Sequence, residues 1–93
     1  MRPNALRRGR EAFETELVGW LNRRYHRPGA SIGRDTPLFQ ERWLDSIRIL
    51  ELIAWTEQAI GRAIPDELIR MDHFRSVATI ARTFLGEADH AVG

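Results

Sequence analysis

The sequence contains no cysteine and no lysine. Without cysteine the chain can form neither a disulfide nor a thiolate-ligated metal site, so any thiol chemistry must come from an added group. No apolar run approaches the roughly 20 residues that cross a bilayer, and no apolar stretch follows the basic N-terminus as a secretory signal would require. We therefore expect a cytoplasmic protein with no membrane partner.

The sequence also lacks the patterns that are typical of catalytic sites and metal centres. Its three histidines, His26, His73 and His90, lie far apart without metal-ligand spacing, and no glycine-rich phosphate loop is present. We expect neither a metal site nor enzymatic activity. His73 and Phe74 are instead expected to pack or cap just before the last predicted helix.

All fourteen basic residues are arginines, and they are unevenly placed. Residues 1–34 carry eight arginines against three glutamates, a net charge of +5, whereas residues 35–93 have a net charge of −4. A solvated helix face is the simplest interpretation, because the basic part lacks glycine-rich spacing and a regular interleaving of aromatic residues with its arginines. The alternative hypothesis is a helical nucleic-acid-binding module that uses the N-terminal arginines Arg7, Arg8, Arg10, Arg23, Arg24 and Arg27.

Ninety-three residues suffice for a single domain, 1–93, with a core over about 11–85 and flexible ends at 1–9 and 87–93. Helical periodicity recurs along the chain, whereas the alternation typical of strands does not. The predicted elements are a helix over 10–25, a long loop over 30–44, a helix over 46–60, a short helix near 65–71 and a helix over 77–85. Together they predict an all-α, antiparallel four-helix bundle with a long loop between helices one and two and a short third helix.

Apolar residues at helical spacing identify the expected core. They are Phe13, Leu17, Trp20 and Leu21 in the first helix, and Val77, Ile80, Ala81, Phe84 and Leu85 in the last. Single apolar residues, Ile32, Leu38, Phe39 and Trp43, are expected to hold the long loop against this core. Ser76 is the expected N-cap of the last helix, and Gly61 and Gly86 are expected to end the second and last helices.

The second predicted helix has two different faces at 100° per residue. Its expected core face holds Ile49, Leu50, Ile53 and Ile60. The opposite face holds Arg48, Glu51, Trp55 and Gln58, with Ile47 at its edge. A large aromatic on an outward face usually has a partner, so Trp55 is expected either to meet another protein or to lie over its own chain.

Asp45-Ser46-Ile47 places a serine hydroxyl at the start of this second helix. Such a dipeptide is also what an ordinary N-cap looks like, so the order of its neighbours matters more than the motif. That order is Asp35-Thr36-Pro37-Leu38-Phe39 ahead, Leu44 directly before, Ile64-Pro65-Asp66-Glu67 after the helix, and then Phe74 and the helix that starts at Val77. From about Glu11 to Leu85 this arrangement resembles the acyl and peptidyl carrier protein superfamily.

The resemblance implies that Ser46 is the attachment point of a covalent 4′-phosphopantetheine arm derived from coenzyme A. A phosphodiester there would sit at a helix N-terminus, where unpaired backbone N–H groups and the helix dipole favour an anion. By position, Asp45 is the residue that in this family helps place the metal-bound coenzyme A of the transferase. The arm supplies the thiol that the chain lacks, and a carrier of this kind catalyses nothing itself.

The resemblance also implies partners: a phosphopantetheinyl transferase, an acyl- or aminoacyl-loading ligase and downstream acyl-transfer enzymes, which a monomer would serve. Two departures from the family pattern bear on docking. Trp43 stands where glycine is common, two residues before Asp45, and is expected to pack onto the core or to affect how a partner approaches. The second helix is less acidic than in fatty-acid-synthase carriers.

Partner enzymes are therefore expected to dock on Ile47, Arg48, Glu51 and Trp55, with Trp43 at the entrance of the helix. The mixed charge of this stripe favours a stand-alone aminoacyl carrier or a specialised acyl carrier outside primary fatty acid synthesis. An ordinary acyl carrier of a polyketide or lipid pathway is the close second interpretation.

Overall fold

The computed structural model describes residues 9–86. Within them the chain forms three α-helices, α2 (Gly9–Arg24), α3 (Arg48–Ile60) and α4 (Val77–Leu85), and two short 3₁₀-helices, η1 (Asp66–Leu68) and η2 (Met71–Phe74). No strand occurs in this part of the chain, so the all-α prediction is confirmed. The predictions for the chain ends, including those for Arg7, Arg8 and His90, lie outside the described residues.

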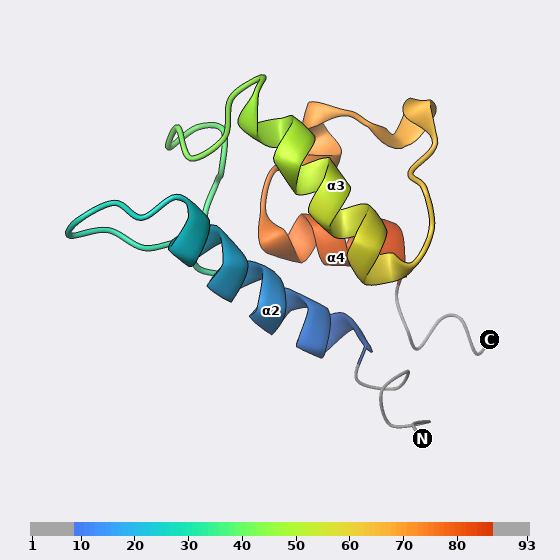
Figure 1. The fold of residues 1–93 in the computed structure, drawn as a ribbon, viewed down its shortest axis with the longest axis horizontal. Coiled ribbons are helices and arrows are strands. Elements are labelled where there is room, and N and C mark those ends of the chain that lie inside the picture. Colours follow the sequence, from blue (N-terminus) through green and yellow to red (C-terminus); the bar gives the residue numbers. More distant parts are fainter. Residues whose placement is uncertain (1–8, 87–93) are drawn as a thin grey trace.

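The helices surround a single core. In Figure 1, α2 and α3 run in opposite directions, the long loop joins them at one end, and α4 lies behind α3. α4 packs against α2 and against η2. None of the helices of residues 9–86 is both long enough and apolar enough to cross a bilayer.

The predicted short third helix is replaced by two 3₁₀ turns. In η1 the N–H of Leu68 donates to the carbonyl of Pro65, and in η2 the N–H of His73 donates to the carbonyl of Arg70. Arg70, between the two turns, is extended, with φ −133° and ψ 148°. A single helix does not form here because so few residues bring little stability of their own, and the segment instead follows the surface of the core.

The core contains most of the residues expected from helical periodicity. Phe13, Leu17 and Leu21 of α2 are buried, while Trp20 is only partly buried. In α4, Val77, Ile80, Ala81 and Phe84 are buried, and the Ser76 hydroxyl accepts a hydrogen bond from the Thr79 N–H at 3.2 Å as the predicted N-cap. At the end of α3, Gly61 takes φ 77°, a left-handed conformation that glycine adopts without strain.

The long loop between α2 and α3 is held to the core as expected. Ile32, Leu38 and Trp43 are buried. The Leu38 N–H donates to the carbonyl of Arg75 at 2.8 Å, so the backbone itself ties the loop to the segment before α4. These contacts fix the position at which the chain enters α3.

The expected core face of α3 is wrong by part of a turn. The fully buried residues of α3 are Leu52 and Thr56, whereas Leu50 is 61% exposed. Ile49, Ile53 and Ile60 are only partly buried. On one flank of α3, Trp55 packs against α2. On the other flank, Ile49 lines a pocket together with residues of η2. The face between these two flanks is therefore the one that points into the core.

Candidate functional site

Ser46 lies on the surface, in the turn that leads into α3. The Ile49 N–H donates to the carbonyl of Asp45 at 3.0 Å, so helical hydrogen bonding begins at Asp45, three residues before the formal start of α3. Among residues 9–86, the Ser46 hydroxyl makes no hydrogen bond to the protein. The structure thus places Ser46 at the start of this helix, with its hydroxyl exposed to solvent.

Asp45 is the residue that caps α3. Its Oδ1 atom accepts hydrogen bonds from the backbone N–H groups of Ile47 at 3.0 Å and Arg48 at 2.8 Å. The bond from the Arg48 N–H is the main cause that lowers the pKa of the Asp45 carboxyl, and the bond from Ile47 and the charge of Arg48 add to it. The N–H groups that were expected to be unpaired beside Ser46 are thus already taken by Asp45.

An apolar pocket of about 430 Å³ opens next to Ser46. Its lining residues come from the long loop, from the start of α3 and from the segment of η1 and η2: Phe39, Asp45, Ser46, Ile49, Ile69, Arg70, Met71 and Phe74. Phe74 is fully buried and forms part of its wall. A group attached to Ser46 would therefore have an apolar surface within reach.

The large hydrophobic side chains that are exposed in the described part of the chain all lie near Ser46. Ile47 and Leu50, on the first turn of the helix, are 68% and 61% exposed, and Met71, in the pocket wall, is 65% exposed. Ile69, also in the pocket wall, is 38% exposed. Exposed apolar residues gathered in one place mark a surface that contacts another molecule.

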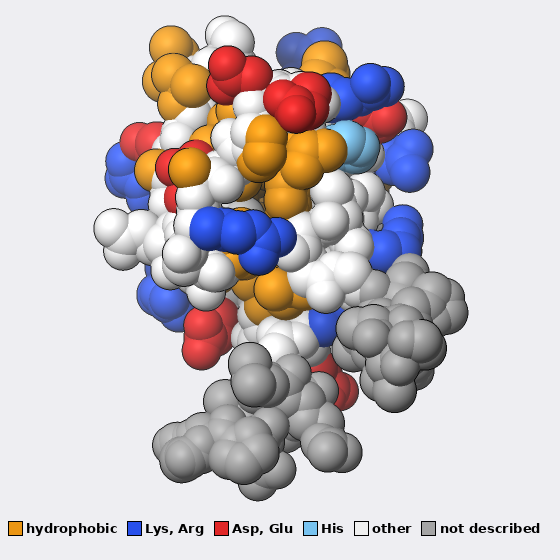
Figure 2. All heavy atoms as spheres, turned by 90° about the vertical axis from the view of Figure 1, so that its right-hand side faces the viewer, with side chains coloured by type: hydrophobic (Ala, Val, Ile, Leu, Met, Phe, Trp, Pro, Cys, Tyr) orange, Lys and Arg blue, Asp and Glu red, His pale blue; other side chains and the backbone are white. Residues whose placement is uncertain are grey.

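Charges of both signs lie among hydrophobic side chains on one face of the molecule (Figure 2). Figure 2 shows one face of the molecule, on which orange hydrophobic side chains lie among red acidic and blue basic side chains.

Arg48 and Glu51 make contacts within the chain. The Arg48 guanidinium lies 4.5 Å from the centre of the Tyr25 ring and donates to the carbonyl of Trp43 at 3.1 Å. Glu51 accepts hydrogen bonds from the Tyr25 hydroxyl and, at 2.6 Å, from Arg24. The Tyr25 bond is the main cause that lowers the pKa of Glu51, and the Arg24 bond is the second. Burial is the main cause that raises the pKa of Tyr25 to about 12, and the bond to Glu51 adds to it.

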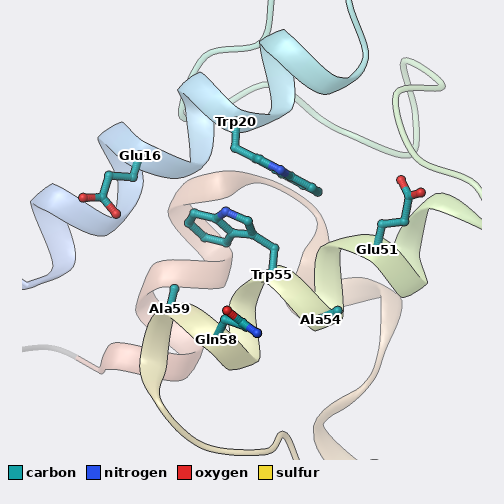
Figure 3. Close-up of a pocket in the computed structure, with 7 residues that line it drawn as sticks. All are labelled: Glu16, Trp20, Glu51, Ala54, Trp55, Gln58 and Ala59. Carbon is teal, nitrogen blue, oxygen red and sulfur yellow. The ribbon is translucent and has the colours of Figure 1, made fainter.

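Trp43 and Trp55 are both held by the chain itself. Trp43 is 1% exposed, with the Arg27 guanidinium 3.8 Å from the centre of its ring. It packs onto the core and offers no surface to a partner, so the expectation that Trp43 contributes to partner docking is corrected. Trp55 is partly buried against α2, where the centre of its ring lies 5.7 Å from that of Trp20 (Figure 3). The ring of Phe13 lies 5.5 Å from it. Of the two interpretations of Trp55, contact with its own chain is the one observed.

Of the four arginines of the nucleic-acid hypothesis that lie in the described residues, Arg23 is exposed and makes no hydrogen bond or ion pair with residues 9–86, whereas the other three are tied to the fold. Arg10 donates to the carbonyl of Gly86, Arg24 binds Glu51, and Arg27 donates to the carbonyls of Glu41 and Arg42. They form no continuous free basic surface on which the hypothesis could rest. Within residues 9–86, no three His, Asp or Glu side chains are grouped so as to hold a metal ion.

Sequence reasoning missed several residues of the site. It placed Leu50 in the core and gave no role to Ile69 or Met71. The alternation of Ile69, Arg70 and Met71 was the available signal, because positions i and i+2 of a helix point to nearly opposite sides and both cannot face one core. No signal predicted the bond between Tyr25 and Glu51, which are 26 positions apart.

Comparison with protein families gives one finding that agrees with this site. A family model described as a phosphopantetheine attachment site matches residues 15–84, which is well over half of the chain. No curated protein and no solved structure matches the chain. The chain therefore belongs to the family defined by the phosphopantetheine attachment site, within the acyl and peptidyl carrier protein superfamily, and its cofactor is a covalently attached 4′-phosphopantetheine.

Proposed function

We propose that Ser46 is the residue that carries the 4′-phosphopantetheine arm, and that the protein holds an acyl or aminoacyl group on it for partner enzymes. The observation that carries this proposal is the exposed, unbonded Ser46 hydroxyl at the capped start of α3, beside an apolar pocket. Carrier domains of this family are not catalysts, so the chemistry belongs to the enzymes that load and unload it.

The residues around Ser46 fit such an arm. The arm supplies the thiol that the sequence lacks, so that cargo is held as a thioester. Asp45 turns the chain so that Ser46 points to solvent, where a transferase can reach its hydroxyl. Because Asp45 takes the nearest N–H groups, the attraction of the helix start for a phosphate comes from the helix dipole rather than from direct backbone hydrogen bonds.

Asp45 has two tasks in this proposal. Its Oδ1 atom caps α3, and both capping bonds are made by that one atom. Oδ2 would then face the metal ion that accompanies coenzyme A on the transferase, which is the role that this position has in the family. A single carboxylate can perform both tasks because its two oxygens point in different directions.

Two observations bear on the chemical class of the cargo. The mixed charges near Ser46 support partners other than those of primary fatty acid synthesis, which favours an aminoacyl or specialised acyl group. The pocket beside Ser46 favours the acyl alternative, because five of its eight lining residues are apolar, Phe39, Ile49, Ile69, Met71 and Phe74. The ammonium group of an aminoacyl thioester would lose its hydration against these apolar walls. Of the two charged lining residues, Asp45 is engaged in capping α3 and Arg70 would repel the ammonium group, so such a cargo would stay in solvent.

The proposed docking surface consists of Ile47, Leu50 and Met71, with Arg48 and Glu51 at its edge. The three apolar side chains are exposed. Met71 lines the Ser46 pocket, and Ile47 and Leu50 directly follow its lining residues Ser46 and Ile49 in the chain. A partner that covers them would also cover the mouth of the pocket. The cargo would therefore leave the pocket as the partner binds.

Intact-mass measurement tests the attachment site. After incubation with coenzyme A and a broad-specificity phosphopantetheinyl transferase, the wild-type protein is expected to gain the mass of one arm, and Ser46→Ala to gain none. Ser31→Ala is the matched control, because Ser31 is an exposed loop serine and this variant keeps Ser46. Modification that survives in Ser46→Ala, or that is lost in Ser31→Ala, contradicts the assignment.

A further inference from the structure

A second hollow lies between α2 and α3, away from the Ser46 pocket. It has a volume of about 500 Å³ and is lined by Glu16, Trp20, Glu51, Ala54, Trp55, Gln58 and Ala59 (Figure 3). It shares none of these residues with the pocket beside Ser46. We call it the α2–α3 groove.

Aromatic rings form the floor of the α2–α3 groove. The indoles of Trp20 and Trp55 are stacked, with their centres 5.7 Å apart and their planes at 25°. Phe13 and Tyr25 extend this row at its two ends. Both tryptophans are only partly buried, because the small side chains of Ala54 and Ala59 on α3 leave their rings uncovered.

The charged side chains of the groove are acidic. Figure 3 shows Glu16 and Glu51 on opposite sides of the tryptophan pair. The charge of Glu51 is partly neutralised by Arg24, which lies 2.6 Å away. Glu16 makes no ion pair with any of residues 9–86. A further hollow of about 390 Å³ adjoins the α2–α3 groove along α2, and its lining includes Glu11.

No arginine or histidine lines the α2–α3 groove, although the chain has fourteen arginines. The groove thus offers to an incoming group aromatic rings and the carboxylate of Glu16, which is unpaired within the described residues. A cation is attracted by the face of an indole ring and by a carboxylate, and the apolar stem of an arginine or lysine packs on the same ring. The complementary partner is therefore a basic, partly apolar segment.

We propose that the α2–α3 groove is a docking site for a basic segment of a partner protein, whose arginine or lysine side chain lies against Trp20 and Trp55 with its charge near Glu16. The groove is open and continues along α2 toward Glu11, which suits a chain segment better than a single small cation. Ala54 and Gln58 are exposed and follow Leu50 along α3, so the site continues from the surface next to Ser46. The proposal does not depend on the modification of Ser46.

The three tryptophans of the chain allow a direct test by nitrogen–proton correlation NMR of the full-length labelled protein. The probe is a tri-arginine peptide amide, and a tri-citrulline peptide, with a neutral group of nearly the same shape, is its control. We expect the arginine peptide to shift the indole N–H signals of Trp20 and Trp55 and to leave that of the buried Trp43 in place. Added salt should weaken the effect.

Two substitutions test the site without disturbing the core. Glu16→Gln should weaken binding of the arginine peptide about threefold, the size expected for one exposed ion pair, whereas Glu67→Gln, at an exposed acid in η1, should not. Ala54→Arg, at an exposed helix position, places a guanidinium in the groove and should abolish the shifts. Equal shifts with the citrulline peptide, or equal loss with Glu67→Gln, would overturn the proposal.

The occupant of the groove is tested by a variant that lacks residues 1–8, which contain three arginines. If a partner segment is the occupant, the Trp20 and Trp55 signals of this variant should match those of the full chain without peptide. A shift of both signals on deletion would show that the groove binds the N-terminus of its own chain, and would overturn the proposal of a partner protein.

Discussion

Asp45 and Ser46 have different roles at the start of α3. Both residue types are good N-caps, so the sequence predicts a cap at this dipeptide without deciding which side chain makes it. The structure gives the cap to Asp45, through its bonds to the Ile47 and Arg48 N–H groups. A capping serine would have had its hydroxyl held by the backbone. With aspartate as the cap, the serine hydroxyl stays available to a transferase.

The two tasks proposed for Asp45 can be separated by substitution. Asparagine also caps helices but lacks the charge, whereas alanine has neither a capping oxygen nor a charge. We expect Asp45→Asn to keep a melting temperature close to wild type and to slow arm transfer, and Asp45→Ala to lower the melting temperature and also slow transfer. Thermal unfolding followed by circular dichroism and timed intact-mass measurements give the two readouts. Normal transfer in Asp45→Asn would show that the carboxylate acts only as a cap.

The pH dependence of this cap has a definite sign. Because the folded state lowers the pKa of Asp45, its carboxylate stabilises the protein above the unfolded-state pKa and stops doing so as the pH falls through the folded-state pKa. The difference in melting temperature between wild type and Asp45→Ala should therefore shrink in acid.

At the scale of the element, α3 shows the limit of helical periodicity. Its sequence carries apolar residues on most of its circumference, so several faces look equally suited to the core. The prediction that Leu50 faces the core is wrong, and Leu52 takes that place. α2 and α4 have narrower apolar stripes, and there the predicted core residues Leu17, Leu21 and Ile80 are confirmed. Only the packing of α3 between its neighbours decides its register.

Two leucines of α3 give a matched pair of stability measurements. Leu52 is 0% exposed and Leu50 is 61% exposed, although they are two positions apart on one helix. We expect Leu52→Ala to lower the free energy of unfolding by about 2–5 kcal/mol, because it leaves a cavity in the core. Leu50→Ala should change it by less than about 0.5 kcal/mol. Urea unfolding measures both changes in free energy. A larger loss of stability in Leu50→Ala than in Leu52→Ala would show that Leu50, and not Leu52, faces the core.

At the scale of the whole molecule, apolar contacts could be predicted and polar bridges could not. The sequence correctly indicated that Ile32, Leu38 and Trp43 hold the long loop to the core, because single apolar residues stand out in a polar segment. It gave no sign that Arg34 binds Glu14 through two hydrogen bonds, at 3.0 and 3.1 Å. Such partners lie far apart in the chain, and most residues of both types stay in solvent, so only the fold identifies the pairs that form.

Tyr25 provides a test of one such bridge for the whole fold. It joins the end of α2 to α3 by donating its hydroxyl hydrogen to Glu51. The folded state raises the pKa of Tyr25 from its ordinary value of about 10 to about 12. The folded state thus favours the neutral phenol, so this stabilisation is complete below about pH 10 and is lost as the pH rises from about 10 to about 12.

The composition of the chain makes this alkaline transition easy to assign. There is no lysine or cysteine, Tyr25 is the single tyrosine, and arginine stays charged throughout the range. We expect the melting temperature of the wild type to fall as the pH rises from about 10 to about 12. Tyr25→Phe keeps the ring beside Trp20 and Arg48 but removes the hydroxyl, so its melting temperature should start lower and stay nearly constant over that interval. Parallel curves for the two proteins would mean that the bond from Tyr25 to Glu51 does not contribute to stability, and that the aromatic packing and the Arg24–Glu51 pair join α2 to α3.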